Sequence, residues 1–185
     1  SSVTAANAAT VVANTHVTAI TLSETSLTGA QYTTAVAAKV TNTGLTITAA
    51  AAFSAATYYA ADSHVSAITL SVTSLIKTYY TAAVAAKVTN TGLTITSVTP
   101  AEAAALALDS HVASINIAAT SLSKAQYTSA LAAKISNTGL TITSVAAADA
   151  AGLGIDSHVA VISLSSISIS KAQYTAAVAA KVGTA

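Results

Sequence analysis

Hydrophobic and polar residues alternate along short segments that are rich in β-branched side chains. The segment Leu140–Thr143 reads LTIT, with leucine and isoleucine on one face and the two threonines on the other. In Val112–Ala118, Ile115 and Ile117 alternate in the same way with a serine and an asparagine. A period of two residues is typical of a half-buried β-strand. The pattern therefore predicts a strand in each segment.

Alanine-rich segments between these strands carry helix start and stop signals. Thr99–Glu102 reads TPAE, a capping box with proline at the first helical position, and it predicts a helix that runs to Asp109. A second box at Ser123–Gln126 predicts a second helix over the residues that follow. Lys134 would lie in the last turn of this helix, where a cation suits the helix dipole, and Gly139 would supply positive φ after it. The second box recurs at Thr28–Gln31 and Ser170–Gln173, whereas Ile76–Tyr79 departs from it.

These elements belong to an internal repeat. KVTNTGLTIT occurs at 39–48 and again at 87–96, and KISNTGLTIT follows at 134–143. One histidine and one lysine recur at spacings of 47 or 48 residues: His16, His64, His111 and His158, and Lys39, Lys87, Lys134 and Lys181. The chain therefore divides into four repeats of about 47 residues, at 1–48, 49–96, 97–143 and an incomplete 144–185. We expect the single extra residue to fall in Ala49–Ala52, between a strand and a helix.

Two strands and two helices in each repeat, joined by short links, imply parallel strands with right-handed crossovers. The fold class is therefore predicted to be α/β. Residues 1–185 would form a single solenoid, with a parallel sheet backed by short alanine-rich helices. The alternative is an all-α solenoid of the HEAT type, which has a similar period. The β-branched alternation, with glycine before it, favours strands.

The charge content excludes several classes of partner. Only 7% of the residues are charged and the formal net charge is +1, against about 25% charged residues in ordinary domains. No basic stripe is present, so neither nucleic acid nor an anionic membrane is an expected partner. No apolar run is long enough for membrane insertion. The chain has no cysteine, which excludes disulfides and thiol chemistry.

The tripeptide Asp-Ser-His occurs three times, ending at His64, His111 and His158, and it suggests a catalytic triad. Three adjacent side chains point in different directions and cannot form that relay. The first repeat has Asn14 in place of the acid, before His16. We therefore predict a turn in which aspartate and serine bond to the local backbone, and no enzyme.

A metal site is also not expected at the repeated histidines. Two strands per repeat would separate successive histidines by about 10 Å along the stack. Two ligands of one zinc ion must each lie about 2 Å from the metal. The sequence therefore predicts no metal and no cofactor, although a lateral contact between two solenoids could still pair histidines.

Tyrosine also recurs once in each repeat, at Tyr32, Tyr80, Tyr127 and Tyr174. We expect a stacked packing column with its hydroxyl groups at the surface, and the alternative is a platform on which a ligand stacks. Tyr58, Tyr59 and Tyr79 cluster in the second repeat and suggest a lateral contact. Gly152 and Gly154 in the fourth repeat are interpreted as incidental variation.

Threonines align between the repeats and form a candidate surface ladder. Its members are Thr21 and Thr69, Thr46, Thr94 and Thr141, and Thr48, Thr96 and Thr143. On a flat parallel sheet they would form rows of hydroxyl and methyl groups. Such a face could bind ice-like water, glycans or another sheet. The alternative is that the threonines reflect high β-propensity on a solvated face.

The segment LTITSVTPAEAAALALDSHVASINIAATSLSKA resembles the Ala/Ser/Thr-rich repeats of large secreted bacterial surface proteins, including RTX-type adhesins and surface-layer-like proteins. The resemblance covers nearly the whole chain and rests on composition and the repeat pattern. It implies an extracellular or cell-surface location and a structural or adhesive role. The chain departs from these proteins because it lacks the calcium-binding glycine repeats and is less acidic.

These observations predict a structural repeat protein that stacks end to end into a filament, a surface layer or an adhesin stalk. Both ends are expected to lack polar capping repeats and to present bare sheet edges. The expected partner is the protein itself, as a homopolymer or within a longer parent chain, with glycans as a further candidate. The alternative function is a binding module that uses the threonine face for ice or polysaccharide.

Overall fold

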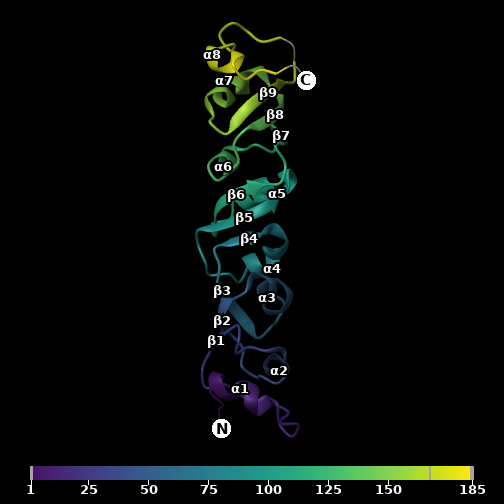
Figure 1. Cartoon of the computed structure of the whole chain (residues 1–185), viewed down its shortest axis with the longest axis vertical. Helices are drawn as coiled ribbons and strands as arrows, with labels where there is room; N and C mark the ends of the chain where they lie inside the picture. The colour runs from purple at the N-terminus through teal and green to yellow at the C-terminus, as the bar shows by residue number, and fades with distance from the viewer. Residues whose placement is uncertain (1, 167, 184–185) are drawn as a thin grey trace. The chain divides into compact units, whose positions relative to one another are not determined.

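The computed structural model describes residues 2–166 and 168–183, and the chain is mixed α/β (Figure 1). The strands are β1 (Ser26–Thr28), β2 (Leu45–Ala50), β3 (Val65–Leu70), β4 (Ser74–Ile76), β5 (Leu93–Val98), β6 (Val112–Ile117), β7 (Ser121–Ser123), β8 (Leu140–Val145) and β9 (Val159–Leu164). They form three three-stranded sheets with the orders β1-β2-β3, β4-β5-β6 and β7-β8-β9. The strands predicted at Leu140 and Val112 are confirmed, and the all-helical alternative is wrong.

Helices of two lengths alternate with the strands. The longer ones are α1 (Ala5–Val12), α3 (Ala52–Ser54) continued by the π-helix η1 (Ala55–Tyr59), α5 (Pro100–Ala107) and α7 (Ala147–Ile155). The shorter ones are α2 (Thr34–Ala37), the 3₁₀-helix η2 (Lys77–Tyr79), α4 (Ala82–Ala85), α6 (Ser129–Ala132) and α8 (Ala176–Ala179). The capping box of α5 is confirmed, because the Glu102 carboxylate accepts from the N–H of Thr99 at 3.2 Å and from its hydroxyl at 2.6 Å.

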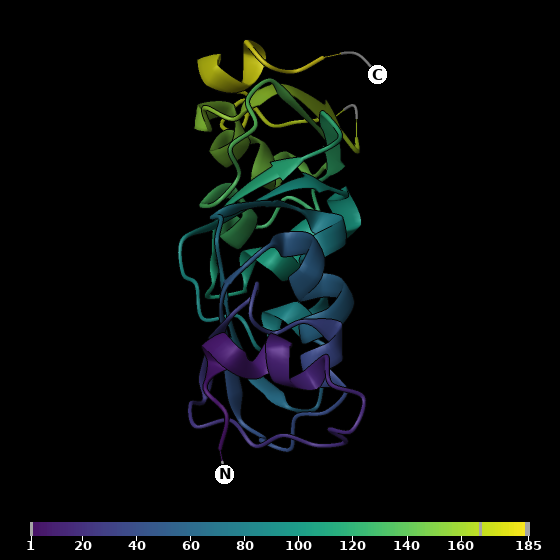
Figure 2. The same cartoon turned by 60° about the horizontal axis from the view of Figure 1, so that its bottom comes forward.

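The chain divides into two compact units, Ser1–Leu93 and Thr94–Ala185. In the first unit α1 packs against α2 and η1 packs against α4. In the second unit α5 packs against α6, and α7 packs against both α8 and β9. Each longer helix therefore contacts the short helix that follows it. Figure 2 shows the helices of the first unit, coloured purple to teal, beside its strands.

The first and third sheets are parallel and share one register. In the first unit Ser26 pairs with Thr46 and Leu45 pairs with Val65, so the partners are 20 residues apart in each case. In the second unit Ser121 pairs with Thr141 in the same way. Isolated parallel bridges extend the pairing at Val3–Leu22, Ile20–Val40, Ile68–Val88, Ile115–Ile135 and Ile162–Val182. Short links through a single helix favour this parallel arrangement.

The core combines large strand residues with small helix residues. Leu45 and Ile47 in the first unit, and Leu140 and Ile142 in the second, are fully buried. One alanine of each longer helix is also completely buried: Ala8, Ala55, Ala103 and Ala150. Alanine loses no side-chain rotamer entropy on burial and lets a helix backbone approach its neighbours closely.

A bulge interrupts the strand that follows each repeated glycine. Ala49 has a φ of 50°, and Ser97 and Ser144 have φ values of 57° and 56°. In the first sheet the register shifts between Ile47 and Ala50. The shift changes the spacing of buried residues, so Ala50 rather than Ala49 turns into the core.

The second capping box does not begin a regular helix. The N–H of Ser123 donates to Gln126 Oε1 at 2.9 Å and the box closes a single turn. The helix α6 begins only at Ser129, where the Thr128 hydroxyl accepts from the N–H of Leu131 at 3.2 Å. The prediction of one helix from Ser123 onward is therefore wrong. A tightly bonded turn comes first, because Ser123 is still part of a strand.

The extra residue of the second repeat lies inside a helix and not in Ala49–Ala52. From the N-cap to the aspartate at the following turn, the second repeat runs from Ala51 to Asp62, one residue more than from Thr99 to Asp109. The strand before the N-cap has the same length in both repeats. A helix absorbs a one-residue insertion as a π-helical turn, and η1 is that turn.

Candidate functional site

The Asp-Ser-His segments form turns between a longer helix and a strand. Asp62 Oδ1 accepts from the N–H of His64 at 2.8 Å and lies 2.9 Å from its Nδ1. The same two contacts occur at His111 and His158 with their aspartates, all at 2.9 Å. In the first repeat Asn14 Oδ1 accepts from the N–H of His16 at 3.0 Å. Each side chain at this position therefore closes its own turn, and asparagine can replace aspartate in doing so.

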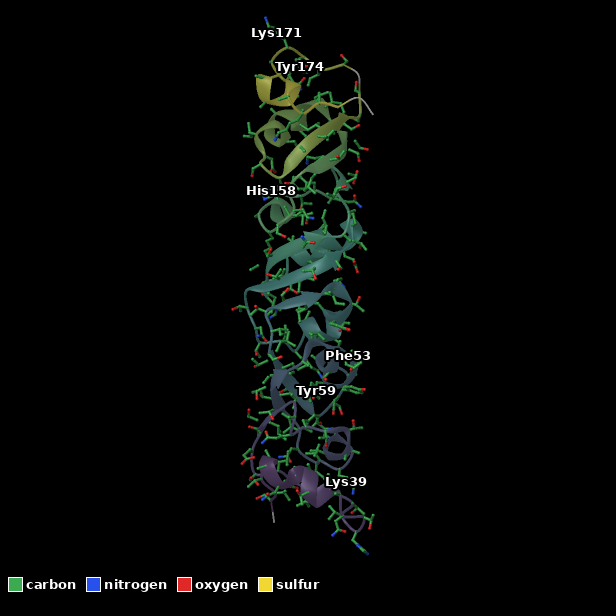
Figure 3. All side chains as sticks on the ribbon, in the orientation of Figure 1. Lys39, Phe53, Tyr59, His158, Lys171 and Tyr174 are labelled. Carbon is green, nitrogen blue, oxygen red and sulfur yellow. The ribbon has the colours of Figure 1, made fainter. Side chains whose placement is uncertain are left out.

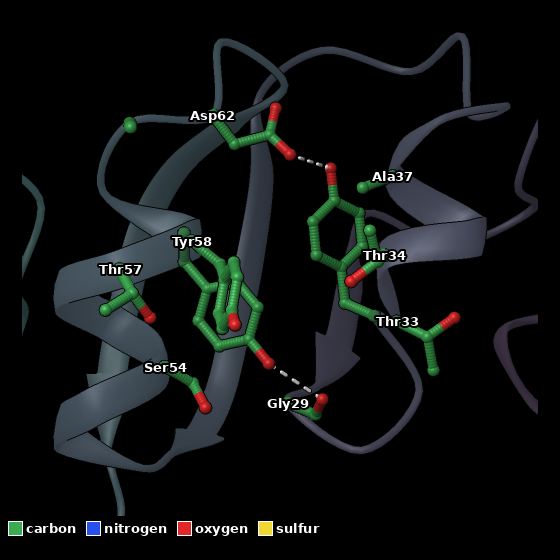
Figure 4. Close-up of a pocket in the computed structure, with 11 residues that line it drawn as sticks. Gly29, Thr33, Thr34, Ala37, Ser54, Thr57, Tyr58 and Asp62 are labelled. Carbon is green, nitrogen blue, oxygen red and sulfur yellow. Dashed lines mark hydrogen bonds between the residues drawn. The ribbon is translucent and has the colours of Figure 1, made fainter.

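The second carboxylate oxygen of the turn aspartate binds a tyrosine from an earlier part of the chain. The Tyr32 hydroxyl donates to Asp62 Oδ2 at 2.7 Å, as Figure 4 shows. The Tyr127 hydroxyl donates to Asp156 Oδ2 at 2.8 Å. Tyr32 is 2% exposed and Tyr127 is 3% exposed. The expectation that these hydroxyl groups lie at the surface is wrong, because each is bonded to a partly buried carboxylate.

The other two repeated tyrosines differ in burial. Tyr80 is 2% exposed, whereas Tyr174 is 50% exposed. Tyr174 lies near the C-terminal end of the second unit and is labelled in Figure 3. The four tyrosines are therefore not equivalent members of one column.

These contacts shift the pKa values of the bonded groups in opposite directions. Burial raises the pKa of the Asp62 carboxyl, but the hydrogen bonds from Tyr32 and His64 outweigh it and hold the pKa below the ordinary value of 3.8. The bonds from His158 and Tyr127 do the same for Asp156, again against the effect of burial. Burial, followed by the bond to the carboxylate, raises the pKa of Tyr32 and of Tyr127.

The repeated lysines bind the same turns from a later part of the chain. Lys87 Nζ donates to the backbone carbonyl of Asp62 at 2.8 Å, and Lys181 Nζ donates to that of Asp156 at 2.6 Å. Lys39 reaches the carbonyl of Val12, at the end of α1, at 2.7 Å. The prediction placed each lysine in the last turn of its own short helix. The lysines in fact follow these short helices, and their ammonium groups bind carbonyls at or just beyond the end of the preceding longer helix.

We use the term node for each complete cluster. The Asp62 node contains Tyr32, Asp62, His64 and Lys87, and the Asp156 node contains Tyr127, Asp156, His158 and Lys181. A node joins three segments of the chain that are 25 to 30 residues apart. Asp109 also belongs to this series, since its side chain closes the turn at His111 and its carbonyl accepts from Lys134 at 2.8 Å.

An asparagine clasp accompanies the nodes and was not predicted as such. Asn42 Oδ1 accepts from the N–H of Leu22 at 2.6 Å, and its Nδ2 donates to the carbonyl of the same residue at 3.2 Å. Asn90 binds Leu70 and Asn137 binds Ile117 in the same two-bond manner. The asparagine side chain thus makes the two hydrogen bonds that the backbone of a neighbouring strand would otherwise make. The sequence signal is the asparagine that lies two residues before each repeated glycine.

The threonine rows are less regular than the alignment suggests. Thr46 pairs with Ser26 on one side and Ala67 on the other. Thr141 pairs likewise with Ser121 and Val161. Aligned threonines of successive repeats are therefore not direct neighbours, because another strand lies between them. Thr94 and Thr96 occupy the corresponding half-buried positions of β5.

Several threonine hydroxyls are already bonded within the protein. Thr48 donates to the carbonyl of Leu27 at 3.2 Å, and Thr143 donates to that of Leu122 at 3.3 Å. Thr21 and Thr69 pair with threonines outside the predicted ladder, Thr41 and Thr89, at 2.9 and 2.7 Å. These hydroxyl groups therefore bond to neighbouring segments of the protein itself.

Among the described residues, no three histidine, aspartate or glutamate side chains gather closely enough to hold a metal ion. Within the same residues no helix is long and apolar enough to cross a membrane. No family model matches the chain, and neither a curated protein nor a solved structure matches it significantly. The resemblance to repeats of secreted bacterial surface proteins therefore stays a prediction from the sequence.

Proposed function

We propose that the chain is a structural repeat protein, an α/β solenoid of about 47 residues per repeat whose layers stack along one axis. In this proposal each repeat supplies two layers of a continuous parallel sheet. The stack serves as a fibre, a surface layer or a stalk outside the cell, as the sequence resemblance implies.

The observation that carries the proposal is the recurrence of the node. A tyrosine, an aspartate, a histidine and a lysine meet with the same atoms and nearly the same distances around Asp62 and around Asp156. The tyrosine and lysine bonds of each node join segments that lie 25 to 30 residues apart. A bonding pattern of this kind can continue through any number of layers, within one chain or between copies.

The bonding partners of the polar side chains also support a structural role. The carboxylates, lysines and asparagines of the repeat bind turns and strand ends of the protein itself. The low charge of the chain, with a net charge of +1, keeps the repulsion between stacked layers small. Neither feature would help an enzyme, which needs polar groups converging on a substrate.

The threonine face receives less support as a binding site for ice or polysaccharide. A regular array needs equivalent hydroxyls on successive strands, whereas Ala67 follows Thr46 and Val161 follows Thr141. Inhibition of ice recrystallisation by the folded chain, lost in Thr94→Lys, would favour that function. A folded chain without such activity would count against it.

Electron microscopy of the protein tests the structural role. Two layers per repeat at about 4.8 Å each give about 40 Å for four repeats. We expect particles elongated along one axis and assemblies whose axial repeat matches this value. Particles that stay short and unassembled over a wide range of protein concentration and salt would contradict the proposal.

A further inference from the structure

A groove of about 540 Å³ in the first unit lies between the short helix α2 and the π-helix η1 (Figure 4). Its lining includes Asp62 at one end and Gly29 at the other, with Tyr58 on the helix side. Tyr58 is 56% exposed. The groove therefore offers one open aromatic ring beside polar groups.

The π-helix makes this groove different from the rest of the repeat. The extra residue of the second repeat lies in this helix, and π-helical turns are frequent at functional sites. The turn places two tyrosines in succession, and the Tyr59 hydroxyl donates to the carbonyl of Gly29 at 2.9 Å across the groove. The Tyr59 ring is thereby buried against Tyr32, with centroids 6.0 Å apart. Its neighbour Tyr58 is left to face the open space.

The second unit supplies an internal comparison. The corresponding groove around Tyr127 and Asp156 has a volume of about 290 Å³. Gly152 and Leu153 stand on its helix side, and Lys124 forms an ion pair with Asp149 at 3.6 Å at its rim. Where the helix lacks the insertion, the groove is smaller and has no exposed ring.

The lining of the larger groove has the chemistry of a saccharide site. The Thr33 hydroxyl accepts from the N–H of Val36, so its own proton can be donated to a ligand. The Thr57 hydroxyl donates to the carbonyl of Phe53 at 2.8 Å, so its oxygen can accept. Sugar hydroxyls both donate and accept hydrogen bonds. The apolar face of a pyranose ring can stack on an exposed aromatic ring such as Tyr58.

The same lining disfavours other classes of ligand. The described residues of this groove include no lysine to bind an anion, and they do include the Asp62 carboxylate. A quaternary ammonium group needs several ring faces around it, but Tyr32 and Tyr59 are 2% and 7% exposed. A wholly apolar ligand would leave the threonine hydroxyls of the groove without partners.

We propose that the groove beside the π-helix binds a neutral saccharide. Tyr58 is the stacking platform, Thr33 and Thr57 bind ring hydroxyls, and Asp62 Oδ2 accepts one further hydroxyl beside that of Tyr32. Phe53 supports the platform, since its ring meets that of Tyr58 edge to face with centroids 6.3 Å apart. The binding site is separate from the stacking role, and either could be present without the other.

The test is titration of the full chain with three neutral tetrasaccharides, namely cellotetraose, chitotetraose and maltotetraose. Tyrosine fluorescence and backbone amide shifts report binding, and the chain has no tryptophan to mask the tyrosine signal. We expect saturable binding of at least one sugar at millimolar concentration or below, with amide shifts centred on Thr57 and Tyr58. No binding of any of the three would overturn the proposal.

Variants locate the site. Tyr58→Ala should weaken binding at least about tenfold, and Tyr58→Phe should retain it, because the ring is kept. Tyr174→Ala is the matched control, since Tyr174 is similarly exposed but lies outside the groove. Unchanged binding in a folded Tyr58→Ala, or binding of tetramethylammonium in place of the sugars, would also overturn the proposal.

Discussion

At the scale of single residues, each turn aspartate of a node takes part in several hydrogen bonds at once. Asp62 accepts hydrogen bonds from a backbone N–H, a histidine ring and a tyrosine hydroxyl, while its carbonyl accepts from a lysine. A carboxylate has room for about four such bonds. Each node therefore depends on one aspartate, and its removal would release two segments of the chain.

The tyrosine bond of the node can be tested by removing one oxygen atom. Tyr127→Phe takes the donor away from Asp156 and should lower the free energy of unfolding by about 1–2 kcal/mol, since the bond is made to a charged group. Tyr174→Phe is the control and should have no effect, because that ring is half exposed. Urea denaturation measures both variants. Equal stabilities of the two variants would show that the node bond contributes nothing.

The lowered pKa values of Asp62 and Asp156 predict a dependence of stability on pH. The folded-state pKa lies below the ordinary value of 3.8. The stabilisation is therefore present above about pH 4 and is lost as the pH falls through the folded-state pKa. Thermal unfolding between pH 6 and about pH 2 should show this loss. In Asp156→Asn the turn can still close, as Asn14 shows, and the loss should be smaller. If the stability of Asp156→Asn fell with pH as steeply as that of the original chain, the assignment of this loss to Asp156 would be contradicted.

At the scale of helices and strands, the sequence predicts the order of elements better than their bounds. The strands that follow the repeated glycines and histidines were predicted because their hydrophobic and polar residues alternate with a clear period of two. The bulge at Ala49 was not, since alanine and serine give no local sign of positive φ. The π-helix was missed for a related reason. An insertion in an alanine-rich stretch cannot be placed by alignment when the neighbouring residues are alike.

The node contacts were missed because they join distant positions. The sequence gives the spacing of tyrosine, aspartate and lysine, but it does not show which repeats they connect. Lys134 reaches back 25 residues to Asp109, whereas the Tyr127 hydroxyl reaches forward 29 residues to Asp156. Only the register of the strands determines whether a side chain bonds to an earlier or a later part of the chain. Tyr58 was found as part of a cluster, but its groove depends on the helix insertion.

The two glycines of α7 give a test at this scale. A Cβ on Gly154 would lie 3.0 Å from the backbone nitrogen of Val178 and 3.1 Å from the backbone carbon of Ala177, in α8. A Cβ on Gly152 would meet nothing within 4 Å. Gly154 therefore lies where α7 packs closely against α8 and is not incidental. The corresponding residues of the other repeats, Ala60 and Ala107, are also small and buried.

Gly152→Ala should raise the free energy of unfolding by about 0.5–1 kcal/mol, because alanine is the better helix former. Gly154→Val should lower it by about 1–3 kcal/mol, because the added side chain has no room. Denaturation by urea compares the two with the original chain. A stabilising Gly154→Val would mean that α7 and α8 do not approach as closely as described.

At the scale of the whole molecule, the proposed solenoid requires that the repeats stack with a constant rise, so that chain length is converted into distance along an axis. Parallel sheets with partners 19 to 21 residues apart, and nodes that recur in both units, support this stacking within each unit. Their continuity from the first repeat to the fourth is what a structural role requires.

Distances between spin labels measure that continuity most directly. The chain has no cysteine, so pairs can be introduced at the exposed middle residues of the four turns, Thr15, Ser63, Ser110 and Ser157. With two layers per repeat, the separations from Thr15 should increase in equal steps of about 10 Å, reaching about 30 Å at Ser157. Equal steps with narrow distributions would establish the stack. Unequal steps, or a broad distribution for Thr15 and Ser157, would contradict it.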